Sequence, residues 1–363
     1  MTGTKRDNYF AIIMAGGVGS RFWPASKASH PKQFLDILGN GETLFQTTFK
    51  RLKKIIPAEN IYVLTNAAYV EMIKEQMPNI KDEQIVPEPA MRNTAPSILL
   101  GTLKIHKKNP HAITLVAPSD HHIKDEEKFT VAVQQAFDNV EEKDRLITLG
   151  ITPNSPNTGY GYINFDTTDG TSIKKVKKFT EKPTLKRAEK FLEDGDYLWN
   201  AGIFVWSTKF ILKCFREFLP EMESLMAKGE KFFNEKNEQE FLEEYYPQAE
   251  NLSIDFGIME KAHEVFVIPV DFGWSDLGTW TSLDAQLPKD ESGNLLVHCR
   301  VLAEDSENNI ISSKNKKIIV LKGLSDYIIV EDDEVILIVP KSEEQYIKNL
   351  RGKVIDEYGK ELG

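Results

Sequence analysis

The sequence has few of the features that mark secreted, thiolate-metal or membrane-spanning proteins. Its 363 residues include only two cysteines, Cys214 and Cys299, which excludes a disulfide framework and a cluster of thiolate metal ligands. No apolar run approaches the ~20 residues that a membrane-spanning helix needs. The apolar run after Lys5 and Arg6 ends at Gly16, and we interpret it as a first core strand rather than a signal peptide. We therefore expect a cytoplasmic protein with no membrane partner.

The sequence also has no net positive charge. The chain carries 45 basic and 55 acidic residues, for a net charge of −10 at pH 7. General nucleic-acid binding needs a broad basic face, so we expect no nucleic-acid partner. One nucleotide in a local basic pocket is still compatible with this charge. The length suits one large domain with a smaller appendage.

One segment lacks acidic residues altogether. No carboxylate occurs from Gly16 to Phe34, a segment that we call the glycine loop. It follows an apolar run and opens with three glycines, Gly16, Gly17 and Gly19. Backbone N–H groups in such a turn can close on phosphate oxygens. The basic residues that follow are Arg21, Lys27 and Lys32, and a bound polyphosphate is the simplest reason for their excess.

Two common phosphate-binding motifs are excluded at the glycine loop. A P-loop ends in Gly-Lys-Ser/Thr, whereas Gly19 is followed by Ser20 and Arg21. A dinucleotide fingerprint needs a third glycine where this chain has Phe22, so the helix could not pack closely on its strand. The loop is therefore of another kind, and a tight surface turn with solvated lysines is the alternative to phosphate binding.

The first half of the chain alternates strand-like and helical patterns. The short, β-branched, apolar runs are Tyr9–Met14, Ile61–Thr65, Gln84–Pro87 and Ala112–Ala117. Between them, apolar residues recur at helical spacing in Thr43–Ile56, Ala67–Gln76 and Thr94–Lys108. This alternation predicts a doubly wound α/β fold. Ligands of such folds bind beyond the carboxyl ends of the strands, where the glycine loop falls.

The expected secondary structure changes twice in the rest of the chain. Leu146 to Trp206 is strand-rich and is expected to extend the sheet, and Lys209 to Ala262 is expected to be largely helical. Around Leu287 the sequence turns to short β-rich runs broken by polar turns: Leu295–Leu302, Asn309–Ser312, Lys317–Leu321, Tyr327–Val330 and Glu334–Val339. We predict a large domain, 1–287, and a small C-terminal β-rich domain, 288–363.

The glycine loop resembles a known family. Gly-Gly-x-Gly-Ser-Arg-x-Trp-Pro followed by Pro-Lys-Gln-Phe is similar to the start of the sugar-1-phosphate nucleotidyltransferases, and most similar to the mannose-1-phosphate guanylyltransferases. The resemblance runs from about Ile12 to Trp280. Phe22 and Lys27 depart from the family's usual leucine and arginine, but neither removes a charge. The resemblance implies a Rossmann-like mixed-sheet catalytic domain and a left-handed β-helix at the C-terminus, although the sequence shows no clean six-residue repeat there.

The resemblance also implies where the nucleotide binds. Glu88 follows a predicted strand, and its carboxylate together with donors from Arg92 to Thr94 could match guanine. The simpler interpretation is a strand-to-helix loop in which Asn93 or Thr94 caps the helix, and both can hold. The expected nucleotide-binding residues are Ala15, Gly16, Gly17, Gly19, Ser20, Glu88, Arg92, Asn93, Thr94 and Ser119.

Two aspartates are the expected metal ligands. Asp120 closes the strand that ends at Ala117, and Asp276 lies in a second block typical of the family. Mg²⁺ prefers one or two carboxylates with phosphate oxygens and water, so we expect Mg²⁺ as the cofactor. His121 and His122 lack further ligands at zinc spacing, and we interpret them as structural or as lining the pocket.

Three further segments are expected to form the sugar-phosphate pocket: one around Gly159, Tyr160 and Gly161, one around Glu181, and one around Asn200. Glu181 can accept from two sugar hydroxyls while Lys182 meets the 1-phosphate. Each segment has an alternative interpretation: a hairpin turn, an exposed ion pair, or a turn before a core strand.

The predicted reaction transfers GMP from GTP to mannose 1-phosphate, with Arg21, Lys32 and Lys182 as catalytic residues. The alternatives are the same chemistry on another sugar phosphate or nucleoside triphosphate, and a regulator that binds sugar nucleotides without turnover. The β-rich tail offers a natural dimer surface, so we expect a homodimer.

Overall fold

The computed structural model describes residues 5–17, 19–168, 170–315 and 317–363, and the chain divides into two compact units. The first unit comprises Met1–Gly16, Phe49–Ser119 and Ile123–Trp274. The second comprises Gly17–Thr48, Asp120–His122 and Ser275–Gly363. The boundary expected at 287/288 lies inside the second unit, which also contains most of the glycine loop. The division into 1–287 and 288–363 therefore stays a prediction.

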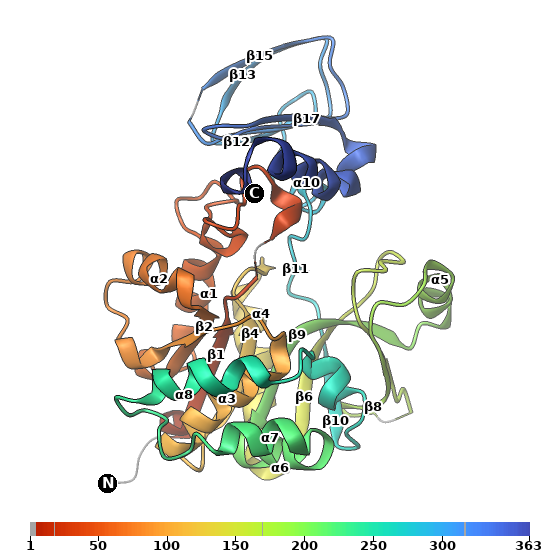
Figure 1. Ribbon diagram of the computed structural model, residues 1–363. Coiled ribbons are helices and arrows are strands. Elements are labelled where there is room, and N and C mark those ends of the chain that lie inside the picture. The colour runs from red at the N-terminus through yellow and green to blue at the C-terminus, as the bar shows by residue number, and fades with distance from the viewer. Residues whose placement is uncertain (1–4, 18, 169, 316) are drawn as a thin grey trace. The chain divides into compact units, whose positions relative to one another are not determined.

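The first unit contains one nine-stranded mixed sheet with the strand order β3-β2-β1-β4-β9-β6-β10-β8-β7 (Figure 1). Its strands are β1 (Tyr9–Met14), β2 (Ile61–Asn66), β3 (Ile85–Glu88), β4 (Ile113–Pro118), β6 (Leu146–Ile151), β7 (Tyr162–Phe165), β8 (Lys174–Thr180), β9 (Tyr197–Ser207) and β10 (Val265–Val270). β1 to β4 are parallel, whereas β9 is antiparallel to β4 and β6. The four strands predicted in the first half are confirmed to within one residue at each end.

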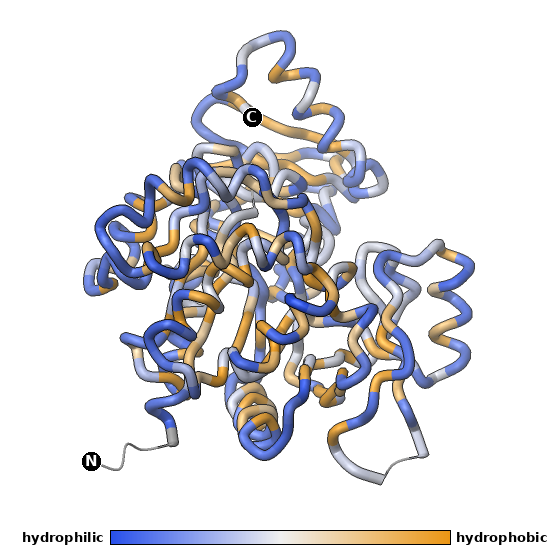
Figure 2. Tube along the Cα trace, turned by 60° about the horizontal axis from the view of Figure 1, so that its bottom comes forward, coloured by the Kyte–Doolittle hydropathy of each residue, from blue (hydrophilic) through white to orange (hydrophobic). Residues whose placement is uncertain are grey.

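Helices cover both faces of this sheet. Tyr9 stacks on Phe137 of α4 with ring centroids 4.1 Å apart. Its neighbour Phe10, like Ile12, instead belongs to the buried cluster that includes residues of α3 and α6. Because successive strand side chains point to opposite faces, α4 and the α3–α6 pair lie on opposite sides. Figure 2 shows apolar residues gathered along the central strands. The predicted doubly wound arrangement is confirmed.

The helices of the first unit are α2 (Val70–Gln76), α3 (Thr94–Lys108), α4 (Glu126–Glu142), α5 (Leu185–Asp194), α6 (Thr208–Phe218), α7 (Pro220–Ala227) and α8 (Glu238–Tyr245). Helix α1 (Leu44–Lys53) and the two-residue strands β5 (His122–Ile123) and β11 (Trp274–Ser275) occur where the chain passes from one unit to the other. Within the described residues, no helix combines the length and the apolar character that crossing a bilayer would require.

The strand register aligns several predicted site residues along one edge of the sheet. Met14 of β1 pairs with Pro118 of β4, so Ala15 and Ser119 both lie just beyond the carboxyl ends of parallel strands. Glu88 ends β3 at the same edge. Asn200 of β9 pairs with Gly150, one residue before the end of β6. This is the edge at which doubly wound folds bind ligands.

The second unit contains a stacked β coil. Its strands are β12 (Leu295–Val297), β13 (Arg300–Glu304), β14 (Ile310–Ser313), β15 (Ile318–Lys322), β16 (Tyr327–Glu331) and β17 (Ile336–Pro340). β12, β14 and β16 are parallel neighbours, β13 is parallel to β15, and β17 is antiparallel to β16. Leu295 pairs with Ile310 and Ile310 with Ile328, so successive turns of the coil use 15 and 18 residues. The predicted β-rich C-terminal region is confirmed.

Two details of the second unit differ from expectation. The run Leu295–Leu302 forms two strands instead of one, because His298 adopts a left-handed conformation with φ +55° and turns the chain. Helices α9 (Trp280–Asp284) and α10 (Ile347–Tyr358) complete the unit, and α10 was not predicted. Ile347 is fully buried in the core cluster that contains Phe22 and Ile310.

Candidate active site

A hollow of about 320 Å³ in the second unit is lined by two of the three predicted catalytic cations, Arg21 and Lys32, and by both predicted metal ligands, Asp120 and Asp276. It is lined by Gly19, Ser20, Arg21, Lys32, Asp120, His121, Asp276, Gly278 and Lys348. Ser20–Phe22 and Lys32–Phe34 form short 3₁₀ turns that present the glycine loop. Residues from four separate parts of the sequence thus surround one polar hollow.

Lys32 holds this hollow together. Its Nζ donates to the backbone oxygens of Asp276, at 2.8 Å, and Leu277, at 3.0 Å, and it lies 2.7 Å from the Asp120 carboxylate. The side chain is only 4% exposed. Burial acts to raise the pKa of Asp120, but the charges of Lys32 and His121 outweigh it and hold the pKa below its usual value. Asp120 is therefore an anion fixed beside the Asp276 loop.

Arg21 is placed differently from Lys32. It is exposed, and within the described residues it has neither a hydrogen bond nor an ion pair. Gly19, two residues earlier, has φ +68°, and a Cβ there would collide with the Cβ of Lys32. Only glycine allows the loop to pass so close to Lys32 while Arg21 faces the hollow.

The third basic residue of the glycine loop does not line the hollow. Lys27 Nζ lies 2.5 Å from Asp332 and 3.3 Å from Glu334, and the side chain is 10% exposed. The interpretation that all three basic residues serve a polyphosphate is therefore wrong for Lys27. Its charge is used to attach the loop to the β coil.

The carboxylates of the hollow fit a magnesium ion. Asp120 and Asp276 line the same space, and Mg²⁺ takes one or two carboxylates when phosphate oxygens complete its shell. Within the described part of the chain, no three His, Cys, Asp or Glu side chains gather as a self-sufficient metal site. An ion held here would thus take its remaining ligands from a bound phosphate and from water.

In the first unit, the backbone just before the glycine loop is already engaged in hydrogen bonds. The N–H of Ala15 donates to Leu64 and its carbonyl accepts from the Thr65 hydroxyl, while the N–H of Ser119 donates to Met14. A Cβ at Gly16 would lie 3.7 Å from a Glu88 carboxylate oxygen. Ala15 and Ser119 therefore shape the sheet edge, and Glu88 lies against the loop.

Glu88 is a buried carboxylate with two hydroxyl partners. It is 8% exposed, and the Tyr246 hydroxyl donates to it. Burial raises the pKa of Glu88 to about 7, against hydrogen bonds from Tyr246 and Ser97 that lower it. Near neutral pH the group is thus partly protonated, and its ionised form is the one able to accept from both guanine donors.

We expect Glu88→Gln to change how stability depends on pH. Because the folded-state pKa is raised, stability linked to Glu88 is present below pH ~4.5 and is lost as pH rises through about 7. The loss amounts to roughly 3 kcal/mol. The measurement is the free energy of unfolding of both proteins at pH 5.5 and 8. The variant should gain stability relative to the parent at pH 8, and an equal pH dependence in the two would contradict this assignment.

Three predicted nucleotide residues that follow Glu88 have structural partners. Arg92 Nε donates to the Pro247 oxygen at 2.9 Å. Asn93, at φ +65°, accepts from the Thr94 N–H and caps α3, which confirms the capping interpretation. The Thr94 hydroxyl accepts from the N–H of Ile254. Contacts of these side chains with a base stay a prediction.

The predicted sugar residues do come together. The Asn200 N–H donates to the Gly161 oxygen at 2.8 Å. A Cβ at Gly161 would collide with a Glu181 carboxylate oxygen, so a larger residue there would displace the Glu181 carboxylate from this position. Lys182 lies 3.3 Å from Glu181 and is two-thirds exposed. Tyr160 packs edge-on against Trp199, with ring centroids 5.0 Å apart.

Asp255 belongs to the same cluster and was missed. The Asn200 side-chain amide donates to its carboxylate at 2.8 Å. Burial and the nearby Glu181 charge raise the pKa of Asp255 to about 6. It opens a π-helical turn, Asp255–Met259, in a region expected to be helical. No spacing in the sequence distinguishes this aspartate from a surface one.

Comparison with known protein families identifies the family of this chain. The sequence profile of the nucleotidyl transferase family matches residues 10–292. The chain belongs to this family. That span contains every predicted nucleotide, sugar and metal residue.

Among curated proteins, the chain is 32% identical over 350 residues to the mannose-1-phosphate guanylyltransferase of Escherichia coli K12, covering 94% of this chain and 72% of the relative. It is 34% identical to the protein of the same name from Klebsiella pneumoniae, covering 93% of this chain and 72% of the relative. A Thermus thermophilus crystal structure described as a "mannose-1-phosphate geranyltransferase" superposes with a TM-score of 0.86 at 28% identity, covering 96% and 99% of the two chains.

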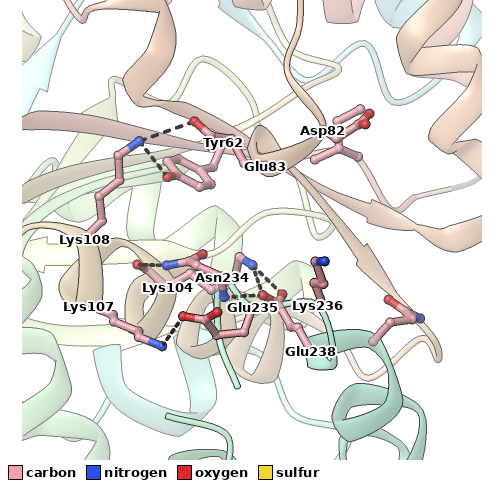
Figure 3. Close-up of a pocket in the computed structure, with 12 residues that line it drawn as sticks. Tyr62, Asp82, Glu83, Lys104, Lys107, Lys108, Asn234, Glu235, Lys236 and Glu238 are labelled. Carbon is pink, nitrogen blue, oxygen red and sulfur yellow. Dashed lines mark hydrogen bonds and ion pairs between the residues drawn. The ribbon is translucent and has the colours of Figure 1, made fainter. Parts of the chain in front are cut away.

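A second hollow, of about 500 Å³ in the first unit, has another role (Figure 3). It includes Tyr62 and Ile85, which stand at the starts of β2 and β3, away from their carboxyl ends. Lys104 is 6% exposed and bonded to Glu238, and Lys108 donates to the Tyr62 hydroxyl at 3.2 Å. The Lys104–Glu238 pair attaches α8 to α3, and the Lys108 hydrogen bond attaches α3 to β2. No predicted site residue lines this hollow.

Proposed function

We propose that this protein transfers GMP from GTP to mannose 1-phosphate, giving GDP-mannose and pyrophosphate. The observation that carries the proposal is the hollow in the second unit, where Arg21 and Lys32 face the two carboxylates Asp120 and Asp276. That combination suits a polyphosphate with a divalent cation. The relatives named mannose-1-phosphate guanylyltransferase support the choice of GTP and mannose 1-phosphate.

The reaction requires that the negative charge of the phosphates is neutralised and that the two substrates are positioned for attack. An oxygen of the sugar phosphate attacks the α-phosphorus of GTP, and pyrophosphate leaves in line. This oxygen is already ionised at neutral pH, so no general base is needed. Two anions must be held against their repulsion, and charge must be stabilised on the leaving group.

We assign the phosphate groups of GTP to the second unit, and the sugar phosphate and the guanine base to the first. In the second unit, Arg21 binds the triphosphate, and Lys32, whose three donors are engaged by the protein, adds its positive charge beside it. Asp120 and Asp276 would hold Mg²⁺, which would supply further positive charge beside the phosphates. The backbone N–H groups around Gly19 and Ser20 add donors to phosphate oxygens.

In the first unit, Glu181 accepts from the hydroxyls of mannose, and Asn200 can donate and accept there. Lys182, two-thirds exposed beside Glu181, meets the 1-phosphate. Glu88, at the carboxyl end of β3, takes the guanine base. We place the protein in the cytoplasm, where these soluble substrates occur.

The test is pyrophosphate release with Mg²⁺ and four nucleoside triphosphates, each offered with mannose, glucose, galactose or fucose 1-phosphate. The highest kcat/KM is expected for GTP with mannose 1-phosphate. A different preferred pair would keep the mechanism and overturn the specificity. Nucleotide binding without release on any pair would favour the regulatory alternative.

We further propose that the β coil is a left-handed β-helix and a homodimer surface. The 18-residue register of Arg300 with Ile318 equals three six-residue edges, which supports the helix form. Several large aliphatic side chains on the coil are more than half exposed: Leu302, Ile318, Val320, Ile336 and Ile338. Apolar groups gathered this way mark protein interfaces.

Val320→Glu tests the dimer. Val320 is 67% exposed and pairs with Leu302 in β13, so a carboxylate here would be buried in any interface that uses this face. We expect the parent to sediment as a dimer and the variant to shift to a monomer at micromolar concentration. A variant that sediments like a dimeric parent would place the interface elsewhere.

A further inference from the structure

Lys348 lines the same hollow as Arg21 and Lys32, although it lies outside the span that matches the family profile. It is the second residue of α10, directly after Ile347. Ile347 is fully buried in the core of the second unit, so the backbone that carries Lys348 is anchored. Its position in the hollow therefore follows from packing of the helix.

The charge of Lys348 is not used by the protein. Lys32 is committed to Asp120 and to two backbone oxygens. For Lys348, as for Arg21, the described residues supply neither a hydrogen bond nor an ion pair. Among the described residues, the hollow thus has two cations without a partner and one that already has three. Unpaired cations on a polar hollow favour a multiply charged anion.

The segment that carries Lys348 is also bonded to the glycine loop. Helix α10 packs against the Ser20–Phe22 turn that contains Arg21. After α10, the Leu362 oxygen accepts from Trp23 Nε1 at 2.7 Å, and the Gly363 oxygen accepts from the N–H of Ala28 at 2.8 Å. These bonds tie the position of Lys348 to that of the loop.

We propose that Lys348 is the third cation for the pyrophosphate part of GTP and for the pyrophosphate product. This inference rests on the proposed function for its substrate, and it makes the C-terminal helix a part of the phosphate site. Lys348 donates to phosphate oxygens. Arg21 and Lys348 together stabilise the negative charge that develops on the pyrophosphate as it leaves.

The test is calorimetric binding of inorganic pyrophosphate with Mg²⁺ to the full chain. A hydrogen bond to a charged group contributes about 1.5–3 kcal/mol, so Lys348→Ala should weaken binding roughly ten- to hundredfold. Lys348→Arg should restore most of it. Lys353→Ala is the matched control, because Lys353 lies on the same helix, donates to the Tyr346 hydroxyl and does not line the hollow.

A second readout separates binding from structural support. Lys348→Ala should also reduce the salt dependence of pyrophosphate binding and raise the KM for GTP, with an unchanged melting temperature and an unchanged KM for mannose 1-phosphate. Pyrophosphate affinity equal to that of the parent would overturn the inference. Because this measurement needs no turnover, a parent that binds pyrophosphate through Lys348 but transfers no GMP would refute the proposed function alone.

Discussion

Arg21→Ala is expected to lower kcat by about 10²–10³-fold, the size of effect seen when one preorganised donor to a transition-state charge is removed. Arg21 is exposed on the hollow of the second unit and bonds to no described residue, so its removal breaks no bond of the described fold. The melting temperature should stay that of the parent. Steady-state pyrophosphate release and a thermal melt measure the two quantities.

Lys27→Ala is the control for Arg21, because it removes a cation from the same loop. Lys27 is bonded to the buried Asp332, which Lys314 also pairs with at 3.3 Å, so the variant should lose about 1–3 kcal/mol of stability. Its kcat at a temperature where it is folded should stay close to that of the parent. Near-normal turnover in Arg21→Ala, or a selective loss of turnover in Lys27→Ala, would contradict the assignment of the two residues.

Glu181→Gln is expected to lower kcat/KM for mannose 1-phosphate by about 100-fold or more, with little change in the KM for GTP. The carboxylate is 12% exposed and accepts as an anion, and hydrogen bonds to charged groups contribute about 1.5–3 kcal/mol each. Initial rates over a range of mannose 1-phosphate at saturating GTP measure the effect. Removing the charge should also lower the pKa of Asp255, which Glu181 helps to raise.

Glu260→Gln is the matched control for Glu181. Glu260 is exposed and accepts from the backbone N–H of Glu181 at 3.4 Å, so it is a glutamate of the same neighbourhood that was not predicted to bind the sugar. This variant should keep the kcat/KM of the parent. Equal losses in the two variants would mean that the whole loop, and not the Glu181 carboxylate, determines sugar binding.

Much of the fold could be predicted because its signals are local. Buried parallel strands are near-continuous apolar runs, and Tyr9–Met14 and Ile61–Asn66 show this pattern clearly. The glycine loop was found for the same reason, since its glycines and cations are adjacent in the sequence. The split of the run at His298 could not be read, because a positive φ at a histidine leaves no mark in the hydrophobic pattern.

The site was predicted where a residue sits in a motif and missed where packing brings it in. Asp255 reaches Asn200 only because a π-helical turn lies beside β9, and Lys348 reaches the hollow only because Ile347 is buried. Lys27 was misassigned for the converse reason. Its charge matches a phosphate, but its partner Asp332 is about 300 residues away in the sequence and close only in the fold.

The most direct test of the central claim is ³¹P NMR of a complete reaction with GTP, mannose 1-phosphate and Mg²⁺. We expect GTP and mannose 1-phosphate to disappear together while GDP-mannose and free pyrophosphate appear in equal amounts. Nothing should change when mannose 1-phosphate is omitted. Release of GDP and orthophosphate, or of GMP and pyrophosphate without a sugar nucleotide, would contradict transfer of GMP to the sugar phosphate.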